Sequence, residues 1–284
     1  MAKKIEHKSK KHATKPRRTP PTAPRVKKTT APRRVMVIVH GGGDFPEDYY
    51  EPLVAKIEAE LGKPFDYLPL YYADVPKAHV GVAAAPASPA EAKFQADLER
   101  ELRRSFEAAL AVQESAGRAV GITATPIEAF ACIAEEVAQY FFDPDIRARI
   151  QARLITRLDQ AMRQYDEIVL NTLSLGTVVS FDTLKRLANQ YEISIWFTCG
   201  SPLAKLRRIG VYDASLGAIT AQNVARWHNV YDDTDYVGDP LGPAFPSPGY
   251  RLHDIFVNVG SGLMGSHDYW NNAETIKMLA DAMR

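Results

Sequence analysis

Short apolar runs rich in β-branched residues alternate along this chain with segments of helical periodicity. Arg34–His40 reads RVMVIVH and ends at three glycines, which is typical of a buried strand. A helix over about 46–62 follows, with Leu53 and Ile57 on one face and Gly62 at its end. Alternation of this kind predicts an α/β protein with a mainly parallel sheet that helices cover on both faces.

The same alternation continues towards the C-terminus. After a second strand near Phe65–Tyr72, helical periodicity runs from about 90 to 165. This stretch is too long for a single crossover between parallel strands, so we expect a cap over one end of the sheet. The later elements are expected as strand 167–172, helix 176–189, strands 193–198, 224–231 and 254–260, and a closing helix from about Asn272.

Positive charge is concentrated at the beginning of the chain. Residues 1–34 contain eight Lys, five Arg and one acidic residue, Glu6, for a net charge of +12. The other 250 residues hold 22 basic and 33 acidic residues, for a net charge of −11. Residues 1–33 have almost no large apolar side chain that could offset the entropy lost on ordering. We therefore expect a disordered basic tail, followed by one domain over 34–284.

Two roles fit this basic tail: a solubilising appendage, or an electrostatic contact with nucleic acid or an anionic membrane. The tail lacks the apolar stretch of a secretory signal. The most apolar segment, about 119–142, is interrupted by Pro126 and three Glu, which argues against a membrane span. Cys132 and Cys199 are too few for a disulfide framework or a zinc site. We expect a cytoplasmic protein without a metal.

A serine lies where a predicted strand turns directly into a helix. Strand Glu167–Thr172 runs through Leu173, Ser174 and Leu175 into the helix that begins at Gly176. At such a turn the hydroxyl is exposed at the carboxyl edge of the sheet, and the next N–H, that of Leu175, points to where an oxyanion forms. Ser174 is therefore the candidate nucleophile. The alternative is an ordinary turn serine, because S-x-G is a common sequence.

This segment resembles the nucleophile elbow of the α/β-hydrolase family, particularly its lipase- and esterase-like members, whose elbow reads S-L-G-T-V-V. Thr172 stands where the family usually has a small residue. Phe197–Leu203 resembles the strand and G-S-P-L turn that follow the nucleophile helix in these proteins. The resemblance covers about 35–284 and implies an α/β-hydrolase fold with a helical cap insert at about 90–165.

Glycines also follow the first strand. His40-Gly41-Gly42-Gly43 resembles the His-Gly segment whose backbone N–H groups complete the oxyanion hole in the family. Glycine lets the main chain approach a ligand without a Cβ in the way. Gly41 and Gly42, with Leu175, are the candidate oxyanion donors, and His40 is expected to orient the loop. The alternative is a tight turn after a strand.

The resemblance also implies a catalytic acid late in the chain. The family's acid follows a strand, in a stretch that commonly reads tyrosine, aspartate, two variable residues and Asp-Pro-Val. Matching this frame to YDDTDYV places the acid at Asp235, with Tyr236 in the place of the proline. Asp232, Asp233 and Asp239 are alternatives.

A histidine lies between the last predicted strand and the closing helix. The segment GLMGSHDYW resembles the family's histidine loop and makes His267 the candidate base, because a general base must lie on a loop above the sheet. Its rivals are less well placed: His228 falls within a predicted strand and His253 just ahead of one. The order Ser174, Asp235, His267 is the nucleophile, acid and base order of this fold.

The sequence therefore predicts a serine hydrolase that cleaves a carboxylic ester or lipid acyl bond through an acyl-enzyme and needs no cofactor. An apolar cap and four tyrosines near the expected site edge favour a small-molecule or lipid ester over a highly charged substrate. These tyrosines are Tyr49, Tyr50, Tyr71 and Tyr72. The alternative is a catalytically weak or inactive hydrolase-fold protein that acts as a binding module, with the basic tail docking on nucleic acid or an anionic membrane.

Overall fold

The computed structural model describes seven stretches of the chain. They are residues 31–75, 86–115, 127–187, 189–213, 222–245, 252–260 and 265–284. The expected tail, residues 1–33, lies outside the described residues except for its last three positions.

Six described strands form one sheet in which each strand is parallel to its neighbours, in the order β2-β1-β3-β4-β5-β6. This arrangement confirms the predicted α/β class and the parallel sheet. The strands are β1 (Arg34–Val39), β2 (Asp66–Leu70), β3 (Glu167–Leu173), β4 (Ile193–Cys199), β5 (Trp227–Tyr231) and β6 (Leu252–Phe256).

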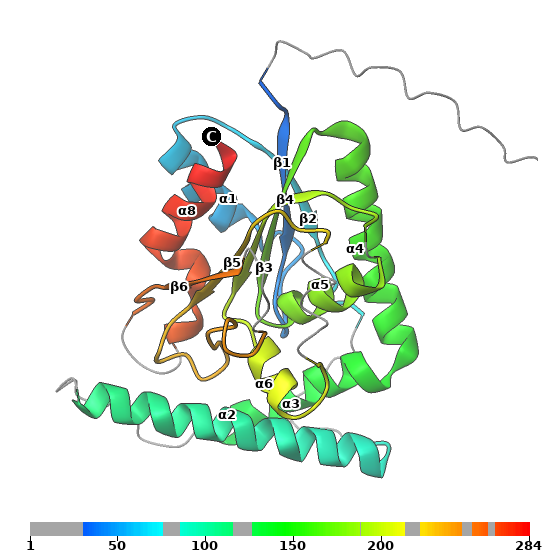
Figure 1. Cartoon of the computed structure of the whole chain (residues 1–284), viewed down its shortest axis with the longest axis vertical. Coiled ribbons are helices and arrows are strands. Elements are labelled where there is room, and N and C mark those ends of the chain that lie inside the picture. Colours follow the sequence, from blue (N-terminus) through cyan, green and yellow to red (C-terminus); the bar gives the residue numbers. More distant parts are fainter. Residues whose placement is uncertain are drawn as a thin grey trace, which may run out of the picture. The chain divides into compact units, whose positions relative to one another are not determined.

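Helices cover both faces of the sheet, as predicted (Figure 1). Alternate residues of β1 explain why: Val35 and Val37 pack into one buried cluster, and Met36 and Ile38 into another on the opposite face. The first cluster lies under α4 and α5, and the second under α1 and α8. The described helices are α1 (Glu51–Leu61), α2 (Pro89–Ser115), α3 (Ile127–Phe142), α4 (Pro144–Gln164), α5 (Leu175–Arg186), α6 (Leu203–Arg208) and α8 (Ala273–Met283).

The helical stretch expected as a cap has two parts. Helix α2 packs against α3 and α6. Because α6 directly follows β4, this packing places α2 across the end of the sheet where the strands finish (Figure 1). Helix α4 instead packs against β1, β2 and β3 and belongs to the layer that covers the sheet. In the described part of the chain, no helix combines the length and apolar character needed to cross a bilayer.

Local signals fix several helix ends. Gly62 ends α1 in the left-handed region, with φ of 70°, and its N–H binds the carbonyl of Glu58. Asp143 caps α4 by accepting the N–H groups of Asp145 and Ile146. Such capping bonds satisfy backbone groups that have no partner within the helix.

Several element bounds differ from those expected, among them the end of α5, at Arg186 rather than at residue 189. Helix α1 begins at residue 51 rather than near 46, and β5 begins at Trp227 rather than at residue 224. Strand β6 spans Leu252–Phe256 rather than 254–260. It ends early because the N–H of Val259 binds the carboxylate of Asp232 at 2.7 Å instead of continuing the ladder.

Candidate active site

Ser174 occupies a sharp turn between β3 and α5. Its backbone has φ of 49° and ψ of −122°, which an L residue rarely adopts, and its N–H donates to the carbonyl of Cys199 at 2.9 Å. Helix α5 passes so close to β1 that a Cβ at Gly176 would overlap the carbonyl oxygen of His40. The strand, turn and helix expected around Ser174 are therefore present, with glycine where no side chain fits.

The side chain of Thr172 points away from this turn. Its hydroxyl donates to the carbonyl of Phe197 at 2.7 Å and accepts the indole N–H of Trp196 at 3.0 Å. Thr172 is fully buried, so these bonds satisfy polar groups that water cannot reach. The methyl and hydroxyl groups that Thr172 has in place of a smaller side chain therefore fit between β3 and β4.

The glycine loop after β1 lies beside Ser174. A Cβ added at Gly41 would be 3.0 Å from the Cβ of Ser174 and 3.6 Å from its hydroxyl oxygen. A Cβ added at Gly42 would be 3.5 Å from a methyl of Leu175. From β1 the chain passes to β2 on one side and then returns to β3 on the other, and ligands bind parallel sheets at the carboxyl ends of the strands where the order reverses in this way.

His40 holds this loop in place and is not exposed to solvent. Its Nδ1 lies 2.7 Å from the carbonyl of Gly41, and its Nε2 accepts the N–H of Tyr72 at 3.0 Å. Burial lowers the pKa of His40 to about 4, so the ring is neutral at pH 7. The Tyr72 hydroxyl donates to the carbonyls of both His40 and Gly41. These bonds give His40 the orienting position that the sequence suggested.

Asp235 and His267 form a hydrogen-bonded pair in which Asp235 is buried and His267 is partly exposed. The Oδ2 atom of Asp235 lies 2.8 Å from the Nδ1 atom of His267 and accepts the hydroxyl of Tyr269 at 2.8 Å, while Oδ1 accepts the N–H of Val237. Burial by itself raises the pKa of Asp235, but His267, Val237 and Tyr269 outweigh it and hold the pKa below its usual value. Because Nδ1 is engaged, the Nε2 atom of His267 remains the nitrogen that can accept a proton.

The three alternative aspartates have other partners. Asp232 accepts the N–H and hydroxyl of Thr234, as in a turn. Asp239 forms ion pairs with Lys205 at 2.9 Å and Arg208 at 2.7 Å. Burial and the charge of Asp232 raise the pKa of Asp233. Of the four aspartates, Asp235 is the one that the structure places against His267.

Ser174 and His267 both border the segment Cys199-Gly200. The N–H of Ser174 binds the carbonyl of Cys199, and a Cβ at Gly200 would lie 2.5 Å from the His267 ring. Among the hydrogen bonds of the described residues, none joins the Ser174 hydroxyl to His267. Catalytic hydrogen bonds often become short only when substrate is bound. The three candidate residues thus gather at the carboxyl ends of β3, β4 and β5.

Three residues of this site were not predicted from the sequence. Tyr269 donates to Asp235 and also accepts the N–H of Asp232 at 2.9 Å. Lys205 is fully buried, and its ammonium group donates to the carbonyl of Val237, which fixes the loop that carries Asp235. Gly238 packs against Gly200, and a Cβ there would be 2.6 Å from Asp235. The sequence offered two signals for these residues: Tyr269 is an aromatic residue soon after His267, and Gly238 is a glycine soon after Asp235.

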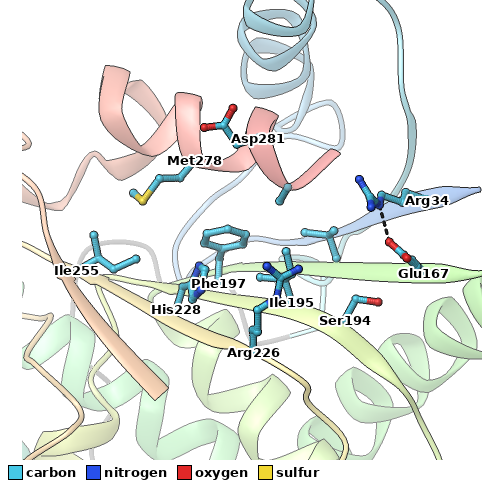
Figure 2. Close-up of a pocket in the computed structure, with 12 residues that line it drawn as sticks. Arg34, Glu167, Ser194, Ile195, Phe197, Arg226, His228, Ile255, Met278 and Asp281 are labelled. Carbon is cyan, nitrogen blue, oxygen red and sulfur yellow. Dashed lines mark hydrogen bonds and ion pairs between the residues drawn. The ribbon is translucent and has the colours of Figure 1, made fainter. Parts of the chain in front are cut away.

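The rival histidines lie away from this site, within β5 and β6, so His253 is inside a strand rather than ahead of it. Their rings are 6.0 Å apart. His228 lines a cavity of about 480 Å³ between the sheet and α8. Figure 2 shows the Arg34–Glu167 ion pair, at the start of β1 and β3, among the residues that line this cavity. None of its lining residues is a candidate catalytic or oxyanion residue.

Two tyrosines expected at the site edge belong to the core instead. The hydroxyl of Tyr49 donates to the carbonyls of Ile38 and Leu70, and the side chain is 8% exposed. Tyr72 is 1% exposed and binds the glycine loop. Both hydroxyls donate to buried backbone carbonyls, so neither ring lines an open site.

Comparison with known proteins adds no assignment. No protein-family model matches the sequence, and no curated protein shows significant similarity to it. Within the described residues, no group of three or more His, Cys, Asp or Glu side chains is arranged to hold a metal ion. The chemistry of the site therefore has to be argued from its own geometry.

Proposed function

We propose that this chain is a serine hydrolase of the α/β-hydrolase fold that cleaves a carboxylic ester or lipid acyl bond. The observation that carries the proposal is the Asp235–His267 hydrogen bond at the sheet edge where Ser174 occupies a strained turn. A carboxylate on Nδ1 orients the imidazole and stabilises its charged form, which is the role of the acid in a Ser-His-Asp triad.

In this mechanism the Ser174 hydroxyl oxygen attacks the carbonyl carbon while its proton passes to Nε2 of His267. The N–H groups of Leu175 and of the Gly41–Gly43 loop bind the oxyanion, each contributing about 3–4 kcal/mol. The imidazolium then protonates the departing alcohol, which leaves an acyl-enzyme on Ser174. Water, deprotonated by His267, releases the acid and restores the serine.

An apolar acyl group suits the surroundings of the site. Phe106 of α2, Phe130 of α3 and Tyr236 of the acid loop pack as an aromatic cluster, with ring centroids 5.3–6.1 Å apart. These rings are buried, so the cap and the loop that carries Asp235 share an apolar contact. An ester with an apolar acyl chain fits a site bordered by such a cap.

Hydrolysis of p-nitrophenyl esters from acetate to decanoate tests this function. We expect turnover that rises with acyl chain length and disappears in Ser174→Ala. Turnover that is unchanged in Ser174→Ala would contradict the mechanism, and a preference for acetate would contradict the substrate class. A complete lack of turnover would favour the binding module with an inactive elbow.

The basic tail supports a second, separable proposal: that it brings the domain to anionic surfaces. Its net charge of +12 opposes the −11 of the rest of the chain. Removal of residues 1–33 is expected to abolish binding to anionic vesicles and polyanions while ester turnover is retained. Unchanged binding would leave the tail a solubilising appendage.

A further inference from the structure

The carboxyl group of Glu136 lies against the glycine loop of the candidate site, although the sequence pattern gives this residue no role. Glu136 belongs to α3. A Cβ added at Gly42 would overlap its Oε2 atom, and the nearby N–H of Gly43 lowers the pKa of its carboxyl. The methyl of Leu175 lies on the same side of Gly42. Glu136 therefore occupies space between the two segments that would supply oxyanion N–H groups.

The surroundings of Glu136 disfavour its negative charge. Burial, opposed by the nearby Gly43 N–H and assisted by the charges of Asp44 and Glu135, raises the pKa of Glu136 to about 7. Burial and the nearby Glu136 raise the pKa of the Tyr72 hydroxyl, so Tyr72 is neutral. His40 is neutral as well, because burial lowers its pKa. The charged groups that act on Glu136 are thus both acidic, and the neutral form is well populated near pH 7.

We propose that Glu136 is part of the oxyanion site and that acyl transfer requires its neutral form. An ionised carboxylate competes with the substrate oxyanion for the Gly43 N–H and repels the charge that develops on the carbonyl oxygen. The neutral acid does neither, and its O–H can donate to that oxygen. The inference rests on Ser174 being the nucleophile, as proposed above.

The sign of the pH dependence follows from this arrangement. Below about pH 7 Glu136 is mainly neutral, and this is the form that supports acyl transfer. Above the pKa of Glu136 the carboxylate form dominates, and the rate of Ser174 acylation falls about tenfold for each further pH unit. A plain serine–histidine site lacks this alkaline fall.

The test is the rate at which a fluorophosphonate modifies Ser174 in the full chain, measured from pH 6 to pH 9. In the native protein we expect the rate to fall above about pH 7. Glu136→Gln keeps the size of the side chain and an N–H donor but cannot ionise, so the fall should disappear. Glu128→Gln, an exposed change in the same helix, should keep the native profile.

A second variant makes the test independent of how well Glu136→Gln folds. Asp44→Asn removes a negative charge that raises the pKa of Glu136, so the fall should move to lower pH. The inference is overturned if Glu136→Gln keeps the alkaline fall, or if the Asp44→Asn profile does not move. If the native protein shows no labelling of Ser174 at any pH, the proposed function itself fails. Labelling that depends on Ser174 but not on Glu136 overturns this inference alone.

Discussion

The imidazole of His267 lies directly against Gly200. A Cβ at position 200 would be 2.5 Å from Cε1 of His267 and 2.6 Å from the ring of Tyr269. Gly200 also has φ of +57°, in the left-handed region that favours glycine. Glycine is therefore required here both by the backbone turn after β4 and by the ring that closes over it.

Gly200→Ala is predicted to push the His267 ring out of position. A displacement of about 1 Å can lower the rate about 10²-fold, so kcat/KM for an activated ester should fall by that order. The matched control is Gly210→Ala: Gly210 has φ of +83°, but a Cβ there meets no atom within 4 Å. This control carries a similar backbone strain and should retain activity. Equal losses in the two variants would show that strain alone is responsible.

The identity of the acid is tested by Asp235→Asn. This change keeps the shape of the side chain but removes the charge that stabilises the imidazolium, and kcat should fall about 10⁴-fold. Asp233→Asn alters a carboxylate that does not contact His267, so activity should remain within a few-fold of native. The assignment is wrong if this variant loses more activity than Asp235→Asn.

Thr172 is predicted to matter for stability rather than for catalysis. Thr172→Val keeps the shape but leaves the Trp196 N–H without an acceptor, which should lower the free energy of unfolding by about 1–3 kcal/mol. Thr172→Ser retains the hydroxyl and should cost less. Urea unfolding measures the first effect, and kcat on an activated ester should stay close to native in both variants. A tenfold change in kcat would mean that Thr172 distorts the elbow.

The sequence predicted the parallel sheet because its strands carry long apolar runs, and it predicted the place of Ser174 because strand, turn and helix follow one another without interruption. It also placed Asp235 and His267 on loops that the structure brings together. The choice among four aspartates could not be made from the sequence. It depends on which carboxylate meets His267 after the chain folds, and the matched motif only ranked Asp235 first.

Other features depend on contacts between distant segments. The position of Glu136 over the glycine loop results from how α3 crosses the end of the sheet, and helical periodicity does not encode that angle. The burial of Tyr49 and Tyr72 follows from hydrogen bonds to β1, β2 and the glycine loop. The early end of β6 depends on the carboxylate of Asp232, which binds the N–H of Val259.

Asp182 is predicted to give the fold a pH-dependent stability. Its buried carboxylate binds Arg147 of α4 and Lys185 of its own helix, α5. Burial raises the pKa of Asp182, but these two cations outweigh it and hold the pKa below its usual value. The resulting stabilisation is complete above the unfolded pKa of about 4 and is lost as the pH falls through the lower folded pKa.

Asp182→Asn should therefore lower the free energy of unfolding by about 1–3 kcal/mol at pH 7, because it removes the buried charge that binds the partly exposed Arg147 and Lys185. The deficit relative to the native protein should shrink as the pH falls from 4 to 3. Urea unfolding at several pH values measures both effects. Asp281→Asn, in an exposed pair with Lys277, should change stability by less than about 1 kcal/mol. A deficit that stays constant with pH would contradict this role of Asp182.

The central claim is that His267, oriented by Asp235, activates the hydroxyl of Ser174. Peptide mapping by mass spectrometry after fluorophosphonate treatment tests it most directly. The account predicts a single adduct on Ser174, absent from Ser174→Ala and formed at least about 10³-fold more slowly in His267→Gln. No adduct on Ser174, or labelling that is equally fast without His267, would contradict it.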